Sequence, residues 1–151
     1  MKNLILTSIL FLISLISFSQ TNISFINENV IYFESGDNLS VDELMLSKET
    51  KFSTENESYG VYNIDLINKE ISLYYEGLTY NWHILENKME DGFLYLKVYE
   101  GIDFNKNEMI AYYRINTNKN EDISFVYQTY DNERNITWGI VSKEIKNLLC
   151  D

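Results

Sequence analysis

The side chains that could bind a metal ion lie in one short segment of the chain. Asp103, Asn105 and Asn107 alternate like the first oxygen ligands of a calcium loop. Such a loop then needs glycine at its sixth position and glutamate at its twelfth, whereas this chain has Glu108 and Arg114 there. We therefore expect a hairpin loop at this point and no metal cofactor, with the three residues as weak candidate ligands only.

A general acid or base would have to be His83, the one histidine, because histidine is the residue type that exchanges protons most readily near neutral pH. A small secreted hydrolase that uses His83 with nearby carboxylates is therefore one hypothesis. The chain lacks the G-x-S-x-G motif, and one histidine cannot make a histidine-rich zinc site. The favoured interpretation is a strand histidine that is exposed or hydrogen-bonded, and no other catalytic residue is predicted.

Cys150 is the one cysteine, so an intramolecular disulfide is excluded. Nothing in the sequence places His83 near this thiol, which argues against a cysteine nucleophile. The favoured interpretation of Cys150 is a small apolar residue near the end of the chain. A dimer linked through Cys150 is the alternative, and it is not favoured.

Residues 1–19 have the features of a cleaved signal peptide. Lys2 gives a positive start, residues 4–18 are almost entirely apolar, and small residues at Ser17 and Ser19 precede a cleavage site before Gln20. The apolar run is short for a membrane-spanning helix, which needs about 20 residues. We expect a secreted or periplasmic protein without a stable membrane anchor after cleavage, in which residues 20–151 form a single β-rich domain.

The chain without its leader is strongly acidic. It keeps 11 basic and 23 acidic residues, a formal charge of −12. Such a charge repels phosphate backbones, because nucleic-acid binding depends on lysine and arginine, and no nucleic-acid partner is expected. The charge favours one hypothesis about a partner, in which the protein is an inhibitor or immunity-type protein for a basic target.

Segments of alternating apolar and polar residues recur along the chain, separated by asparagine, aspartate, glycine and lysine. This pattern is typical of β-hairpins. Lys51–Thr54 is a candidate for a short additional strand. The pattern predicts eight main strands, at Asn29–Glu34, Tyr59–Leu66, Glu70–Tyr75, Thr79–Glu86, Phe93–Glu100, Glu108–Asn116, Ile123–Tyr130 and Ile136–Val141.

The connections between these strands are short, so consecutive strands should pair antiparallel in a meander. The expected fold class is all-β and mainly antiparallel, with about eight strands in a barrel or in a two-layer sandwich. In strand count and order the barrel resembles the outline of a lipocalin. That likeness is one of architecture and does not fix a function.

Two segments are expected to be helical. Ser40 and Glu43 fit a capping box, which predicts a short helix there, although residues 44–46 could instead begin a strand. Residues 142–149 carry a capping serine and apolar residues spaced to form one helical face. A short C-terminal helix packed on the sheet is therefore predicted.

Several strands carry apolar residues on both faces, which a sheet open to water on one side does not need. Either a helix or partner covers the second face, or a barrel carries large side chains inside and outside. Tyrosine also suits strands without any binding role. The leading hypothesis is a non-enzymatic binding module for a protein, a glycan or a small apolar ligand, with weak ligand-binding candidates at Tyr95, Tyr99, Tyr112 and Tyr113.

The signal peptide is tested by the mass of the exported protein. We expect intact mass spectrometry of the protein from the periplasm or medium to give residues 20–151, less one ammonia where Gln20 has cyclised. The same spectrum reports any pairing through Cys150. A mass that includes residues 1–19 contradicts the prediction.

Overall fold

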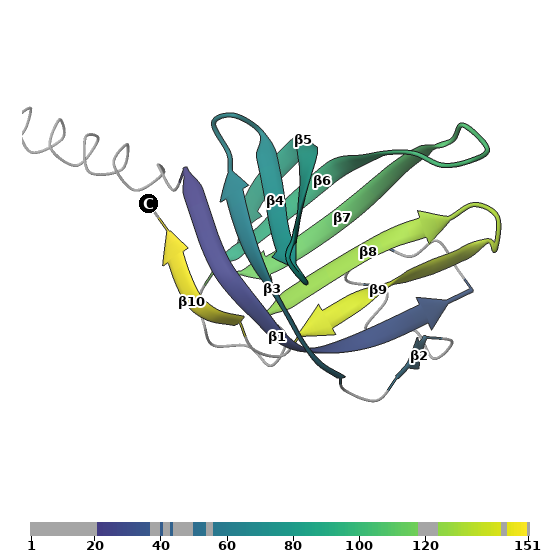
Figure 1. Ribbon diagram of the computed structural model, residues 1–151, viewed down its shortest axis with the longest axis horizontal. Helices are drawn as coiled ribbons and strands as arrows, with labels where there is room; N and C mark the ends of the chain where they lie inside the picture. Colours follow the sequence, from purple (N-terminus) through teal and green to yellow (C-terminus); the bar gives the residue numbers. More distant parts are fainter. Residues whose placement is uncertain are drawn as a thin grey trace, which may run out of the picture.

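The computed structural model describes residues 21–36, 40, 43, 50–53, 56–117, 124–142 and 145–150. The predicted signal peptide lies outside these residues, as does the side chain of Cys150. Within them, one antiparallel sheet of ten strands is present (Figure 1). The strands are β1 (Asn22–Ser35), β2 (Lys51–Phe52), β3 (Asn56–Asp65), β4 (Glu70–Tyr75), β5 (Leu78–Glu90), β6 (Phe93–Ile102), β7 (Glu108–Asn116), β8 (Phe125–Asp131), β9 (Ile136–Ser142) and β10 (Ile145–Cys150).

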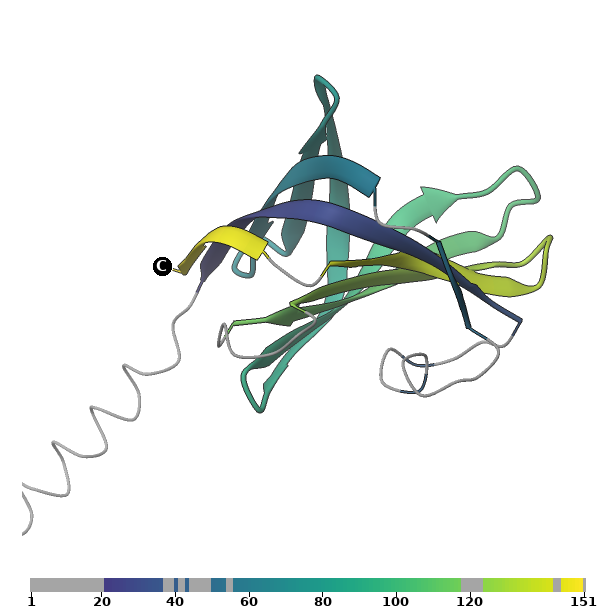
Figure 2. The same ribbon diagram turned by 90° about the horizontal axis from the view of Figure 1, so that it is seen from below.

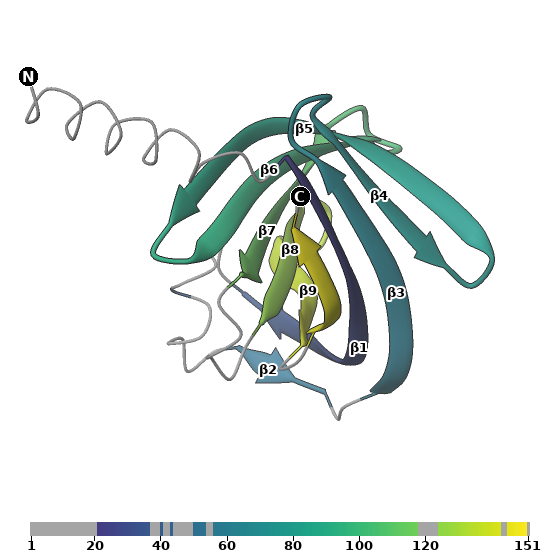
Figure 3. The ribbon, with the colours of Figure 1, turned by 90° about the vertical axis from the view of Figure 1, so that its left-hand side faces the viewer.

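The sheet is a meander that curls back on its first strand. From β3 to β9 each strand pairs with the next along the chain. The first half of β1 pairs with β3, and its second half pairs with β9. Figures 2 and 3 show the resulting curl, in which β1 runs from the β3 side of the molecule to the β9 side.

The curled sheet forms a cup and is not a closed barrel, because β1 meets β3 and β9 through different halves of its length. β10 and β2 pair with β1 beside these contacts. The predicted all-β antiparallel meander is confirmed, and each of the eight predicted main strands has a counterpart. The strands belong to one curled sheet and not to the two layers of a sandwich.

The predicted C-terminal helix over residues 142–149 is wrong. Ile145–Cys150 is strand β10, which pairs antiparallel with residues 23–27 of β1. The apolar spacing fits a helical face, but the exposed edge of β1 offers backbone donors and acceptors that only an added strand satisfies. Tertiary pairing therefore overrides the local helical pattern.

Two tight hairpin turns contain glycine, one of the residue types that separate the strands in the sequence. Glu76 and Gly77, between β4 and β5, both have positive φ, of 49° and 82°. Asp91 and Gly92, between β5 and β6, have φ of 50° and 83°. Two-residue hairpin turns need this backbone to match the twist of the strands, and glycine adopts it without strain.

The larger core lies on the inner face of the cup. A smaller cluster of Phe33, Val126 and Val141 lies on the opposite, outer face, where Phe52 of β2 contacts Phe33 at 6.2 Å between ring centroids. The outer cluster explains the apolar outer residues of β1, β8 and β9, and it includes none from β6 or β7. The buried members of the inner core are Ile23, Phe25, Tyr62, Ile64, Ile71, Ile84, Leu94, Leu96, Val98, Ala111, Tyr113, Ile115 and Phe125.

The capping box predicted at Ser40 is present in its hydrogen bonds. The Ser40 backbone N–H donates to a carboxylate oxygen of Glu43 at 3.0 Å, and the Glu43 N–H donates to the Ser40 hydroxyl at 3.4 Å. Most of the helix predicted to follow lies outside the described residues. The part of the chain that the structure describes holds no helix with the length and hydropathy to cross a bilayer.

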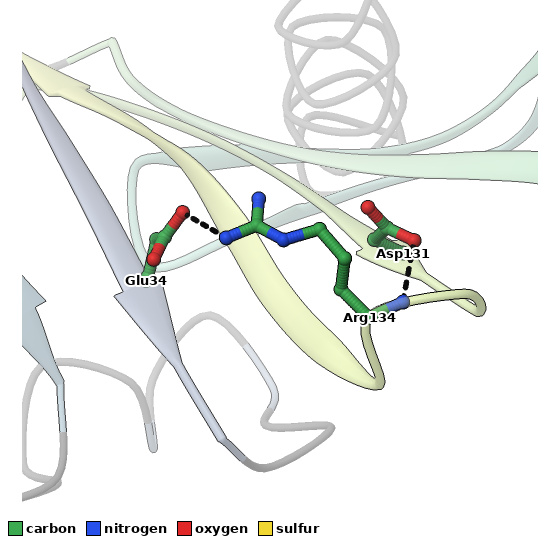
Figure 4. Close-up of polar contacts among 3 residues, drawn as sticks. All are labelled: Glu34, Asp131 and Arg134. Carbon is green, nitrogen blue, oxygen red and sulfur yellow. Dashed lines mark hydrogen bonds and ion pairs between the residues drawn. The ribbon is translucent and has the colours of Figure 1, made fainter.

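One ion pair links β1 to the hairpin between β8 and β9. The Arg134 guanidinium donates to the Glu34 carboxylate at 2.8 Å (Figure 4). The Arg134 backbone N–H also donates to the Asp131 carboxylate at 3.0 Å, which fixes the turn that carries the arginine. Both charged side chains are more than half exposed, so the ion pair orients the hairpin and adds little stability.

A substitution at Gly139 on β9 tests how closely the strands of the cup approach one another. A Cβ atom there would overlap the backbone oxygen of Tyr127 and lie 2.9 Å from Cζ of Phe33. We expect Gly139→Ala to lower the free energy of unfolding by about 2 kcal/mol or more, because backbone cannot yield as a side chain can. Urea denaturation followed by tryptophan fluorescence measures this.

The matched control is Gly36→Ala, because nothing lies within 4 Å of a Cβ atom at Gly36. It should change the free energy of unfolding by no more than about 0.5 kcal/mol. Equal effects of the two substitutions would contradict the close packing around Gly139.

Candidate functional site

The inner face of the sheet encloses a hollow of about 310 Å³, which we call the cup cavity. This volume lies at the lower end of the range of about 300–1,000 Å³ that is usual for small-molecule sites. Most of the lining is aromatic or aliphatic. The lining residues are Asn27, Val30, Tyr32, Gly60, Tyr62, Leu73, Tyr75, Trp82, Glu100, Tyr113, Tyr127, Trp138 and Ile140.

Four aromatic side chains form a continuous wall of the cup cavity. Ring centroids are 6.5 Å apart for Tyr62 and Tyr113, 5.1 Å for Tyr113 and Tyr127, and 5.9 Å for Tyr127 and Trp138, each pair meeting edge to face. Such contacts hold each ring by its neighbours. The wall is therefore preformed, and its members are rings that line the cavity.

Glu100 is the one charged residue among those that line the cup cavity. It is the extra residue of a β-bulge, since Tyr99 pairs with Ile110 and Gly101 with Met109. Its carboxylate accepts a hydrogen bond from the Tyr113 hydroxyl at 3.1 Å and another from the Tyr127 hydroxyl at 3.0 Å. Two neighbouring strands, β7 and β8, thus hold the carboxylate in place.

Burial changes the proton affinity of this cluster. Loss of solvation raises the pKa of Glu100, and the hydrogen bonds from Tyr127 and Tyr113 oppose only part of that rise. Burial and the nearby Glu100 also raise the pKa of Tyr62, Tyr113 and Tyr127. The three tyrosines therefore keep their protons, and Tyr113 and Tyr127 donate to the glutamate.

Asn27 of β1 brings a second polar group to the cup cavity. Its side chain is 1% exposed, and its amide oxygen has no hydrogen-bond partner in the structure. A buried acceptor without a donor is costly, at about 1–3 kcal/mol. The oxygen is itself buried, so Asn27 adds an unsatisfied acceptor close to the cavity lining.

Two further hollows meet the cup cavity at Glu100. One, of about 350 Å³, is lined by His83, Glu70 and Tyr99 among others. The second, of about 270 Å³, lies beside the loop that contains Asp103. Glu100 lines all three hollows, so this carboxylate lies where they converge.

The weak catalytic candidate, His83, lies on β5 with its side chain exposed. It pairs across strands with Glu70 and with Tyr99. The hydrogen bonds described for this protein include none from the His83 ring, and no serine or cysteine is among the residues that share its hollow. The arrangement brings a histidine near carboxylates without an assembled nucleophile.

Of the four tyrosine candidates, the structure brings only Tyr113 into the cup cavity. Tyr112 is 42% exposed, and strand alternation puts it on the outer face, opposite Lys97. Tyr95 alternates onto the same outer face, and Tyr99 lines the hollow of His83. The four tyrosines therefore do not form one surface.

The calcium-like segment is the hairpin loop between β6 and β7. The Asp103 carboxylate accepts hydrogen bonds from the backbone N–H groups of Asn105 and Asn107 and from the Asn107 side chain. The bonds from Asn107 hold the pKa of Asp103 below its usual range. Among the described residues, no group of three or more histidine, cysteine, aspartate or glutamate side chains is placed to hold a metal ion.

The sequence prediction misses the residues that characterise the cup cavity, namely Glu100, Asn27, Trp82, Tyr127 and Trp138. One signal could have found Glu100. It follows Leu94, Leu96 and Val98 at a spacing of two, so it is an acid on a face that is otherwise apolar. No comparable signal marks the other four.

Comparison of the chain with protein-family models, with curated proteins and with solved structures gives no match. The functional argument therefore rests on the cup cavity itself.

Replacement of Glu100 by glutamine tests the burial of its charge. When folding raises the pKa of an acid, the folded state binds the proton more tightly than the unfolded state, so stability falls as pH rises from the ordinary glutamate pKa through the raised one. Glu100→Gln keeps the shape and removes this loss. We expect the variant to be more stable than the natural protein at neutral pH, with a smaller difference in acid.

Urea midpoints of both proteins between about pH 4 and about pH 7 measure the difference. Glu108→Gln, at an exposed site where β7 begins, makes the same change of charge and should leave the pH dependence unaltered. A difference between natural protein and Glu100→Gln that is constant with pH would refute the assignment.

Proposed function

We propose that this protein binds a small, largely apolar ligand in the cup cavity and carries out no chemistry on it. The observation that carries the proposal is the preformed aromatic wall around a hollow that holds only a few polar groups. Small-molecule sites have this character, because apolar walls supply affinity and a few polar groups fix orientation.

The rigidity of the wall supports the proposal. Tyr62 and Tyr113 are 4% and 1% exposed, and each contacts other rings of the core. A ligand that enters such a site orders few side chains, so little of the contact free energy is lost to conformational entropy. The interior is thus better suited to bind a small molecule than the outer face, where the exposed Tyr112 has charged neighbours such as Lys97.

Tryptophan fluorescence can report ligand binding in the cup cavity directly. The chain has two, Trp82 and Trp138, and both line the cup cavity. We expect the neutral apolar dye N-phenyl-1-naphthylamine to become fluorescent on binding and to quench tryptophan emission with a one-to-one stoichiometry. Quenching with the same midpoint as the dye signal would locate the dye beside the tryptophans.

A pair of identical substitutions tests the location. Leu73→Phe fills space in the wall of the cup cavity and should weaken dye binding by about tenfold or more, which corresponds to about 1.4 kcal/mol. Leu78→Phe places the same change at a residue that is 58% exposed and outside the cavity lining, and it should leave the affinity unchanged.

Circular dichroism and urea midpoints of both variants show whether the fold is retained. Equal dye affinity in the two folded variants would contradict binding in the cup cavity. An absence of dye binding to the natural protein, at dye concentrations up to its solubility, would contradict the proposed function as a whole.

A further inference from the structure

The cup cavity is lined by an acidic residue and by no basic one. Glu100 brings a carboxylate, and Asn27 brings an amide oxygen that lacks a donor. No lysine, arginine or histidine is among the lining residues. The cavity therefore offers a carboxylate without a basic residue among its lining residues to balance it.

Glu100 differs in this respect from the three surface acids that form ion pairs. In the ion pairs of the described residues, Glu86 accepts from Lys97 at 3.1 Å, Glu90 from Lys88 at 2.6 Å and Glu34 from Arg134 at 2.8 Å. The partners described for Glu100 are two neutral tyrosine hydroxyls. An interior carboxylate without a cation is unfavourable, so a positively charged ligand would gain by supplying the missing charge.

The aromatic wall suits a cation as well. Ring faces carry negative electrostatic potential, so a desolvated cation over tyrosine or tryptophan is stabilised. The chain already uses this interaction on its outer face, where the Arg114 guanidinium lies 3.7 Å from the centroid of the Phe93 ring. The cup cavity presents Tyr62, Tyr127 and Trp138 around a carboxylate, with no protein cation over them.

A bare metal ion fits this lining poorly. Calcium and magnesium need about six or more oxygen ligands, whereas the cup cavity has one carboxylate and no cluster of ligating side chains among the described residues. A wholly neutral ligand leaves the carboxylate without a counter-charge. An organic ammonium ion satisfies the carboxylate and the rings together.

We infer that the ligand of the cup cavity is an organic ammonium ion with apolar substituents, held between the aromatic wall and the Glu100 carboxylate. The inference rests on the proposed function, because it assigns a chemical class to the ligand of the same cavity. Glu100 determines the preference for charge, and the rings provide most of the contact area.

Choline and 3,3-dimethylbutan-1-ol make a suitable pair of probes. They have the same shape and the same hydroxyl group, and they differ in having a positively charged nitrogen or a neutral carbon at the centre. We expect choline to displace N-phenyl-1-naphthylamine from the natural protein at neutral pH at a concentration at least about tenfold lower than the alcohol.

Two variants test whether the preference for choline arises in the cup cavity. Glu100→Gln should lose most of the preference for choline over the alcohol, because the amide keeps the shape and removes the charge. Trp138→Leu removes a ring face and should weaken choline binding more than alcohol binding. Glu108→Gln is the control for net charge, since it changes an exposed acid outside the cavity, and it should keep the preference.

Each outcome has a distinct meaning. Equal displacement by the two probes, or a preference for choline that survives in Glu100→Gln, would overturn the inference and leave binding in the cup cavity intact. Dye binding that neither probe reverses also overturns it. If the natural protein binds neither dye nor probes, the proposed function fails first, and the assignment of a ligand class fails with it.

Discussion

The architecture depends on the double pairing of β1. This strand hydrogen-bonds to β3 through its first half and to β9 through its second half, and so joins the two ends of the meander. Without that junction the strands would form an open sheet with one large solvated face. With it, the same alternation of side chains gives an inside and an outside, and the inside becomes a site that two neighbouring strands could not form alone.

The interior then sets a conflict between stability and the proposed binding of a ligand. Apolar residues such as Leu94, Leu96 and Val98 fill the face on which Glu100 also lies, and the carboxylate there is held by tyrosines instead of a cation. A core selected only for stability would carry an apolar or amide side chain at this position. A partly buried charge with a preformed aromatic surround is typical of a functional site.

The sequence predicts the strands well and the site poorly, for different physical reasons. Strand positions follow from alternation and from turn residues that tolerate positive φ, and both are local, as at Glu76-Gly77 and Asp91-Gly92. The C-terminal segment fails because its partner, the edge of β1, is more than a hundred residues away in the chain. Glu100 is one of 23 acidic residues, and its role depends on the curl that brings β6, β7 and β8 around it. Tyr113, Tyr127 and Trp138 all lie in predicted strands, and only the curl of the sheet shows that they face the cavity.

The two hydroxyl groups that hold Glu100 have a consequence of their own. Tyr113 and Tyr127 are direct cross-strand partners on β7 and β8, so one ladder position aims both hydroxyls at the same carboxyl group. A phenol hydroxyl can donate a hydrogen bond or accept one. When the carboxyl group is ionised both tyrosines donate, and when it gains a proton one of them can reverse its role while every heavy atom stays in place. Proton uptake at the centre of the fold therefore reverses a hydrogen bond without moving a strand.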